Sequence, residues 1–188
     1  MIIKDLTVKF GDHVVLDHLD LEIKDKGLTL ISAPSGFGKT TLFRAIAGLC
    51  RIESGTFFDV GRLSYAFQET RLLPWYSALE NVALVRPDKD AYQAEKLLLR
   101  FGLTKEEIYL RPDELSGGMN QRVNLARAFF YDGDTILLDE PFVGLDAANI
   151  NRVCELIDEY KKDRCIVMIS HDYTNRSIAD IVIELDRI

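Results

Sequence analysis

Cysteine is scarce in this sequence, and the three that occur, Cys50, Cys154 and Cys165, are widely spaced. Their spacing fits no zinc pattern, so we expect three reduced and mostly buried thiols. Long apolar runs are missing too, since none approaches the ~18 residues that a membrane-spanning helix needs. The first residues, MIIKDLTVKFGD, carry charge too early for a signal peptide. We therefore expect a cytoplasmic protein that contacts a membrane only through a partner.

Positive charge is also in short supply. The sequence has 23 Lys and Arg residues against 30 Asp and Glu residues, which gives a formal net charge of -7. Attraction of the whole surface to nucleic acid is therefore not expected, although a local basic patch stays open. Low-complexity tracts, long linkers and internal repeats are lacking as well. A chain of 188 residues with 47% hydrophobic and 28% charged residues fits one globular domain.

The first third of the sequence indicates strands followed by a helix. Leu19, Leu21 and Ile23 alternate with charged residues, which is typical of a half-exposed strand, and the first thirty residues are predicted to form antiparallel strands. Residues 28–32, LTLIS, form a short apolar run that predicts a buried strand. A glycine-rich loop follows, and then a helix is expected from about residue 39 to 49.

The rest of the sequence changes from helical to mixed patterning. Residues 77–131 show few strand signals, and we interpret them as a helical insertion because their apolar residues recur at helical spacing, as in Tyr92, Leu97, Leu98 and Phe101. Apolar runs at 135–139 and 165–170 then flank a predicted helix at 147–160. This arrangement predicts a β-α-β unit with parallel strands.

The glycine-rich loop has the sequence APSGFGKTT, residues 33–41. Backbone N–H groups of such a loop wrap phosphate oxygens, and the following helix N-terminus adds positive potential. Lys39 would reach the β- and γ-phosphates, and the Thr40 hydroxyl would bind Mg²⁺. Ala33 stands where the usual pattern G-x-x-x-x-G-K-[ST] has glycine. Because Gly36 and Gly38 remain, we expect Ala33 to adopt an ordinary negative φ; the plain alternative for the whole motif is a glycine-rich turn.

A second motif, TILLDEP, covers residues 135–141. Its apolar run would carry Asp139 to the C-terminal end of a buried strand, where α/β sheets place their ligands. Asp139 would hold Mg²⁺ there, and the next residue, Glu140, would polarise an attacking water molecule. The alternative is a strand that ends in a solvated acidic turn.

A third motif, LSGGMNQR at residues 115–122, opens a predicted helix and supplies a second anion site at Ser116, Gly117 and Gly118. A dimeric motor needs a second phosphate cradle, because one subunit can cap the γ-phosphate bound to the other. The alternative is a serine-capped helix with two small residues. With the two motifs above, the chain resembles the ATP-binding cassette (ABC) family, whose signature is LSGGQ; Met119 replaces the glutamine.

The resemblance to the ABC family covers nearly the whole chain and assigns further roles. It implies that Phe10 stacks on adenine beside Val15, and that Gln68 in YAFQE links the nucleotide to the membrane partner. It also implies that Asp146 in VGLDA crosses the dimer interface and that His171 in ISHD contacts the γ-phosphate. Each role has a plain alternative: Phe10 could be a core aromatic, Gln68 an exposed glutamine, Asp146 a helix N-cap and His171 a surface histidine. His13 and His18 match no family motif and are expected at the surface.

The resemblance therefore implies an ATP hydrolase with ATP and Mg²⁺ as cofactors. The implied catalytic residues are Glu140, His171, Gln68 and Lys39. The implied magnesium ligands are Thr40, Gln68 and Asp139. The implied nucleotide-binding residues are Phe10, Val15, Ser35, Gly36, Phe37, Gly38, Lys39, Thr40, Thr41, Ser116, Gly117, Gly118, Met119 and Asp146.

Residues 69–84, ETRLLPWYSALENVAL, look like the segment that follows the glutamine in ABC importers of nitrate, sulfonate and taurine type, a group in which LSGGM also occurs. The apolar run from Leu72 to Trp75 would be costly to leave in water, so it predicts a partner-facing surface. The alternative is that Trp75 packs inside the helical insertion.

These observations predict an α/β fold: a P-loop NTPase core with a mixed, mainly parallel sheet, an antiparallel β subdomain and a helical insertion, all within a single ABC ATPase domain over residues 1–188. The expected function is ATP hydrolysis that powers import of a small solute. The expected partners are a membrane permease and a second ATPase subunit, identical when assembled. The alternatives are an exporter ATPase, a soluble ABC ATPase that takes no part in transport, and a non-hydrolysing binding module, which would require the loss of Glu140 or His171.

Overall fold

The computed structural model describes residues 1–34, 36–170 and 177–185. It divides into two compact units. The first comprises residues 1–65, 133–139 and 161–188, and the second comprises residues 66–132 and 140–160.

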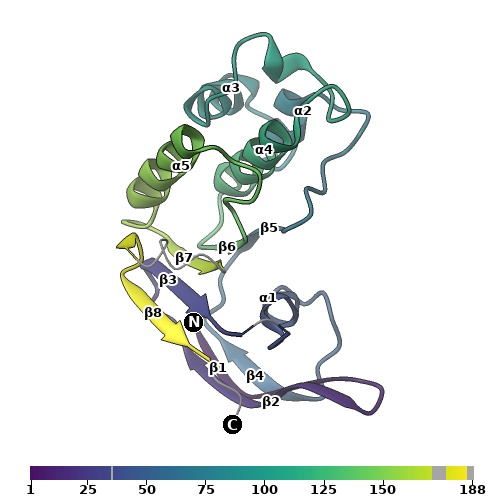
Figure 1. The fold of residues 1–188 in the computed structure, drawn as a ribbon, viewed down its shortest axis with the longest axis vertical. Coiled ribbons are helices and arrows are strands. Elements are labelled where there is room, and N and C mark those ends of the chain that lie inside the picture. Colours follow the sequence, from purple (N-terminus) through teal and green to yellow (C-terminus); the bar gives the residue numbers. More distant parts are fainter. Residues whose placement is uncertain (35, 171–176, 186–188) are drawn as a thin grey trace. The chain divides into compact units, whose positions relative to one another are not determined.

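The first unit contains a three-stranded antiparallel sheet with the strand order β2-β1-β4 (Figure 1). Its strands are β1 (Ile2–Phe10), β2 (His13–Glu22) and β4 (Ser54–Phe58). A two-residue turn joins β1 to β2, so that Phe10 pairs with His13. This sheet confirms the antiparallel strands predicted for the first thirty residues.

The first unit also contains a five-stranded sheet with the order β5-β6-β7-β3-β8. Its strands are β3 (Gly27–Ser32), β5 (Leu63–Ala66), β6 (Thr135–Asp139), β7 (Cys165–Ile169) and β8 (Ile181–Glu184). β3 pairs in parallel with β7 and β8, and β6 pairs in parallel with β7. All residues of β6 and β7 are buried, which explains their uninterrupted apolar sequences.

One hydrophobic core joins the two sheets of the first unit. It includes Ile3 and Leu16 from the antiparallel sheet, Ile31 and Leu137 from the parallel sheet, and Phe43 from α1 (Lys39–Ile46). Each such side chain contributes about 1.5–3 kcal/mol when it leaves water. The core therefore fixes the position of the loop between β3 and α1, which carries the glycine-rich motif. Helix α1 ends at Ile46, three residues earlier than the sequence predicted.

The second unit is helical. Its elements are α2 (Ala78–Ala83), α3 (Ala91–Arg100), a short 3-10 helix (Glu107–Tyr109), α4 (Gly117–Phe130) and α5 (Ala147–Tyr160). Side-chain caps start three of them, because Ser77, Asp90 and Ser116 accept hydrogen bonds from backbone N–H groups of the first turn. The helix predicted at 147–160 has those bounds.

A cluster of aromatic side chains lies in the second unit, beside its mostly aliphatic core residues. The Phe101 and Phe129 rings meet edge to face with centroids 5.7 Å apart, and Phe129 meets Tyr160 at 5.0 Å. Tyr92, counted above among the apolar residues at helical spacing, is 64% exposed and is not part of the buried face of α3; its ring instead contacts the Lys96 ammonium group.

The cysteines are free thiols; Cys165 is buried, while Cys50 and Cys154 are only half-buried. Within the described ranges, no helix has both the length and the apolarity needed to span a membrane.

Candidate functional site

The glycine-rich loop leaves β3 and enters α1 in the first unit. Gly36 and Gly38 have φ of 77° and 105°, a region that side chains with a Cβ rarely adopt. A Cβ on Gly38 would lie 2.6 Å from Cγ1 of Val15, so β2 approaches the loop too closely for any other residue. The described non-glycine residues with positive φ do not include Ala33, which confirms the prediction for that position. Ser35 lies outside the described residues.

Lys39, the first residue of α1, is buried, and its ammonium group is held by the loop itself. Nζ donates to the carbonyl oxygen of Ala33 at 2.7 Å and to that of Pro34 at 3.2 Å. A positive charge is thereby placed against the loop and the N-terminus of α1, where it favours an anion. The next two residues, Thr40 and Thr41, are half-buried on α1.

Asp139 ends β6 with its side chain only 2% exposed. Its Oδ2 accepts a hydrogen bond from the Tyr65 hydroxyl at 3.0 Å, whereas Oδ1 is buried without a hydrogen-bond partner among the described residues. Burial raises the pKa of this carboxyl, and hydrogen bonds from Tyr65 and Thr40 oppose the shift, as do the charges of Arg44 and Lys39. A buried carboxylate oxygen beside the Thr40 hydroxyl fits the oxygen ligands that Mg²⁺ prefers. The predicted pairing of Thr40 with Asp139 is therefore present in the first unit.

Glu140 follows Asp139 and is buried, with 8% of its surface exposed. Its φ is 49°, in the left-handed region that a non-glycine residue rarely occupies. Such conformations gather at functional sites, where the surroundings fix them. Nothing in the sequence signals this backbone conformation.

The LSGGM segment caps and opens α4 in the second unit. The Ser116 hydroxyl accepts from the Met119 N–H at 3.3 Å, and the Ser116 N–H donates to the Met119 sulfur at 3.4 Å. A Cβ on Gly118 would lie 2.7 Å from the carbonyl oxygen of Gly144, whereas a Cβ on Gly117 would meet no atom within 4 Å. Packing therefore requires glycine at position 118, where a Cβ would meet the backbone, but not at position 117, which faces open space.

The remaining predicted site residues lie at the ends of elements. Gln68 is exposed just beyond β5, and Phe10 is 54% exposed at the end of β1. Asp146 caps α5, since its Oδ1 accepts from the Asn149 N–H at 2.9 Å, so its N-cap interpretation is confirmed. Val15 is half-buried on β2, against Gly38. His171 lies outside the described residues.

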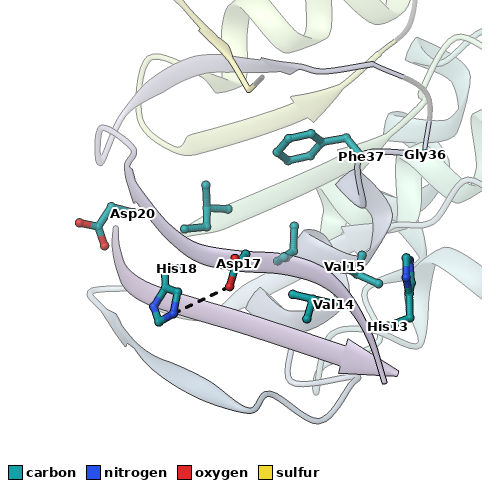
Figure 2. Close-up of a pocket in the computed structure, with 10 residues that line it drawn as sticks. His13, Val14, Val15, Asp17, His18, Asp20, Gly36 and Phe37 are labelled. Atoms are coloured by element: carbon teal, nitrogen blue, oxygen red, sulfur yellow. Dashed lines mark ion pairs between the residues drawn. The ribbon is translucent and has the colours of Figure 1, made fainter. Parts of the chain in front are cut away.

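Cavities border the hairpin of β1 and β2. The larger, about 770 Å³, is lined by residues 13–20 of β2 and by Gly36 and Phe37 of the glycine-rich loop (Figure 2). Phe10 lines the smaller one, about 610 Å³, and Val14 lines both. Phe10 and Val15 therefore line different cavities, and Val14 is an apolar neighbour that sequence reasoning missed.

His13 and His18 are exposed, as expected, but both line the larger cavity. His18 Nδ1 lies 2.5 Å from Oδ1 of Asp5, and this contact raises the pKa of the imidazole. Both residues of the pair have positive φ. The sequence gives no sign of this pair, because it depends on an irregularity in the pairing of β1 with β2.

Comparison with known proteins places these features among transport ATPases. Residues 16–143 match the family model described as ABC transporter. A relative from Rhodococcus jostii, "Aliphatic sulfonates import ATP-binding protein SsuB 2", is 38% identical, with 98% of this chain and 78% of the relative covered. A relative of the same name from Frankia alni is 39% identical, with 97% of this chain and 76% of the relative covered.

Solved structures agree with the sequence relatives. "Dimeric Structure of MJ0796, a Bacterial ABC Transporter Cassette" superposes with a TM-score of 0.86 at 25% identity, covering 98% of this chain and 94% of that one. A post-hydrolysis state of the same cassette, bound to ADP and Pi, gives a TM-score of 0.87 at 25% identity, covering 98% and 93%.

Proposed function

The chain belongs to the ABC transporter family, and on that premise we propose that it powers the import of an aliphatic sulfonate or a chemically similar small solute. It is an ATP-binding and ATP-hydrolysing subunit of an ABC transporter. The observation that carries the choice of solute is the 38–39% identity, over nearly the whole chain, to relatives named for sulfonate import. The RLLPW segment after Gln68 points to the same group of importers.

In the proposed mechanism, the first unit holds the nucleotide. Backbone N–H groups of the glycine-rich loop and the Lys39 ammonium group would bind the phosphates. Phe10 would stack on the adenine with Val15 as its apolar companion, and Val14, which lines both cavities, would lie between their two positions. Thr40 and Asp139 would hold Mg²⁺, with Gln68 as a further ligand; the ion would neutralise charge that develops on the phosphates. Glu140 would accept a proton from the attacking water molecule as the water oxygen bonds to the γ-phosphorus and ADP leaves. The family resemblance assigns the contact with the γ-phosphate to His171.

In the proposed assembly, two identical subunits face each other head to tail. Ser116 to Met119 of one subunit would cap the γ-phosphate bound by the other, and Asp146 would lie at their interface. We propose that residues 1–188 act as one ABC ATPase domain, with a helical subdomain at about 77–131. The permease would hold the assembly at the cytoplasmic face of the membrane and contact the Gln68–Trp75 surface.

The test of this function is reconstitution of the chain with a permease and a solute-binding protein of the sulfonate-import type. An alkanesulfonate-loaded binding protein is expected to stimulate ATP hydrolysis in proteoliposomes, and labelled alkanesulfonate is expected to accumulate inside. The unloaded binding protein serves as the control. Efflux of the solute without any binding protein would identify an exporter, and stimulation by a chemically unrelated solute alone would overturn the assignment of sulfonates.

A further inference from the structure

A row of polar side chains lies buried along one face of helix α4. Gln121 is 3% exposed and Asn124 is 0% exposed, while Arg127 is half-buried. These residues are spaced three apart, so they share one face of the helix. Buried polar groups are costly unless they make hydrogen bonds. The hydrogen-bond partners of these three side chains therefore show which backbone segments the row holds in place.

At one end, the row supports the backbone of the proposed catalytic carboxylate. Gln121 Nε2 donates to the carbonyl oxygen of Pro141 at 3.1 Å and reaches that of Glu140 at 3.5 Å. Glu140 has a positive φ, and such a conformation persists only where its surroundings fix it. Gln121 makes a direct contact that helps to do so.

At the other end, the row holds the segment that carries Gln68. Asn124 Nδ2 donates to the carbonyl oxygen of Phe67 at 2.9 Å and lies 3.5 Å from Oε1 of Gln121. Arg127 donates to Oδ1 of Asn124 at 3.3 Å and to the carbonyl oxygen of Arg71 at 2.7 Å. Gln68 therefore lies between two backbone positions that α4 holds.

We propose that Gln121 and Asn124 form a polar relay that fixes Glu140 relative to the Gln68 segment. Hydrogen bonds depend on distance and direction more sharply than apolar contacts do, so displacement of Phe67 would strain its bond to Asn124 and, through the 3.5 Å contact, would disturb Gln121. Movement imposed by the permease at the Gln68 segment would reach the water-activating carboxylate by this route. The two side chains are positioning residues, and the functional part of the inference rests on the proposed role of Glu140.

The test uses substitutions that keep the shape but remove the hydrogen bonds: Gln121→Met, Asn124→Leu and the double variant. Asn120→Leu is the matched control, since Asn120 also lies on α4 and donates to two carbonyl oxygens, at 2.8 and 3.5 Å, but these belong to Pro112 and Leu115. Amide hydrogen exchange is followed at residues 67–71 and 140–146, and kcat and KM for ATP are measured in parallel.

The relay predicts effects at a distance. Asn124→Leu raises exchange at 140–146, and Gln121→Met raises exchange at 67–71. Either variant lowers kcat by about tenfold or more with KM within about threefold, and the double variant is no slower than the slower single variant. Asn120→Leu changes neither segment. If Asn124→Leu does not fold, Asn124→Ala takes its place, because its smaller side chain lets water reach the Phe67 carbonyl group.

Two results would overturn the relay: exchange changes confined to the segment that each side chain contacts, or kcat losses that multiply in the double variant. Unchanged kcat despite exchange changes at both segments would refute the link to catalysis. A wild-type protein that does not hydrolyse ATP would contradict the proposed function instead, while the exchange data would still decide whether the two segments are linked.

Discussion

Glu140 combines burial with a backbone conformation that non-glycine residues rarely adopt. A general base needs a fixed position relative to the water molecule that it activates, and a residue held by its surroundings in the left-handed region meets that need. The neighbouring Asp139 differs in kind: its buried Oδ1 suits a cation, and its Oδ2 is engaged by Tyr65. Two adjacent carboxylates thus have environments suited to different tasks.

Glu140→Gln is expected to lower kcat for ATP hydrolysis by roughly 10²–10⁴-fold, because the amide keeps the shape but cannot accept the proton. ATP binding is expected to persist, since Lys39 and Asp139 are unchanged, and the variant should accumulate as an ATP-bound dimer. Phosphate release, nucleotide titration and size-exclusion chromatography with ATP are the measurements. Glu155→Gln, an exposed carboxylate on α5, is the control. Turnover above about a tenth of the wild-type rate would show that Glu140 is not the main base.

The residues of the site divide into those that the sequence predicted and those that it could not. Local motifs predicted the roles of Lys39, Thr40 and Asp139, because the spacing within each motif is typical of a phosphate and magnesium site. The structure brings these three residues together. The partner of Asp139, Tyr65, is 74 positions away along the chain, and no local pattern links the two. The positive φ of Glu140 and the support from Gln121 likewise arise from tertiary packing.

The two glycines in the N-terminal turn of α4 differ in whether packing requires them. Gly118 lies against the backbone of Gly144, while Gly117 faces open space. The first turn of a helix is also where anions are bound. Packing therefore explains only one of the two glycines in the signature, and the proposed γ-phosphate of the partner subunit explains the other.

Gly118→Ala is expected to destabilise the chain by about 1–3 kcal/mol, because its Cβ cannot fit against the Gly144 carbonyl group. Gly117→Ala is expected to raise the melting temperature slightly, since alanine favours a helix over glycine by about 0.8–1.0 kcal/mol in the interior and by less at the first position, where Gly117 lies. The same Gly117→Ala variant should lose ATP-dependent dimerisation and turnover. Calorimetry and ATPase assays test the pair; a Gly117→Ala variant with full activity would show that no ligand approaches this turn.

A carboxylate just before β8 adds a link to β3 beyond the backbone pairing of the two strands. The Leu28 N–H donates to Asp180 Oδ2 at 2.7 Å, and Lys161 Nζ donates to Oδ1 at 3.1 Å. The hydrogen bond from Leu28 is the main cause that lowers the pKa of Asp180. A lowered pKa means that the contribution to stability is present above the unfolded-state value of about 3.9, and is lost as the pH falls through the lower folded-state value.

Asp180→Asn is therefore expected to lower the free energy of unfolding by about 1 kcal/mol at pH 7. For a chain of this size, that corresponds to a decrease of roughly 2–4 °C in melting temperature. The difference from wild type should shrink as the pH falls below about 4, because the wild-type carboxyl group becomes neutral too. Melting curves from pH 3 to 7 measure it. Asp163→Asn, in an exposed pair with Lys26 at 3.8 Å, is the control and should not differ from wild type. A difference that persists undiminished at pH 3 would contradict the role of the charge.

Element types could be predicted better than their arrangement. Alternation in β2 and continuous burial in β6 and β7 leave a direct mark on the sequence, because side-chain exposure follows the strand period. The order β5-β6-β7-β3-β8 leaves none, since parallel neighbours are joined by long connections. Tyr92 illustrates an error of spacing within a helix: it lies off the face that Ala94, Leu97 and Leu98 bury, and its ring contacts Lys96 in solvent.

At the scale of the whole molecule, the segment after Gln68 presents apolar surface. Trp75 is 64% exposed and Tyr76 is 38% exposed, with ring centroids 6.4 Å apart, while Leu72 and Leu73 are half-buried. The alternative that Trp75 packs inside its own chain is therefore wrong. The Asn81 amide holds this segment by donating to the carbonyl oxygens of Leu73 and Tyr76, each at 3.1 Å. An aromatic pair that is held in place and exposed to water is typical of a protein-binding surface. Covering it with a partner would contribute about 25 cal/mol of free energy per Å² of apolar surface removed from water.

Trp75→Ala is expected to leave ATP binding by the separated subunit unchanged, but to weaken assembly with the permease and to uncouple hydrolysis from transport. Removal of a central aromatic anchor typically costs 2 kcal/mol or more, which corresponds to a roughly thirtyfold loss of affinity. Tyr92→Ala is the matched control, because Tyr92 is an aromatic with the same 64% exposure, on α3. Pull-down of the permease and stimulation of ATPase activity in proteoliposomes are the measurements. Equal losses in the two variants would indicate nonspecific surface effects, and normal assembly and transport with Trp75→Ala would place the permease contact elsewhere on the subunit.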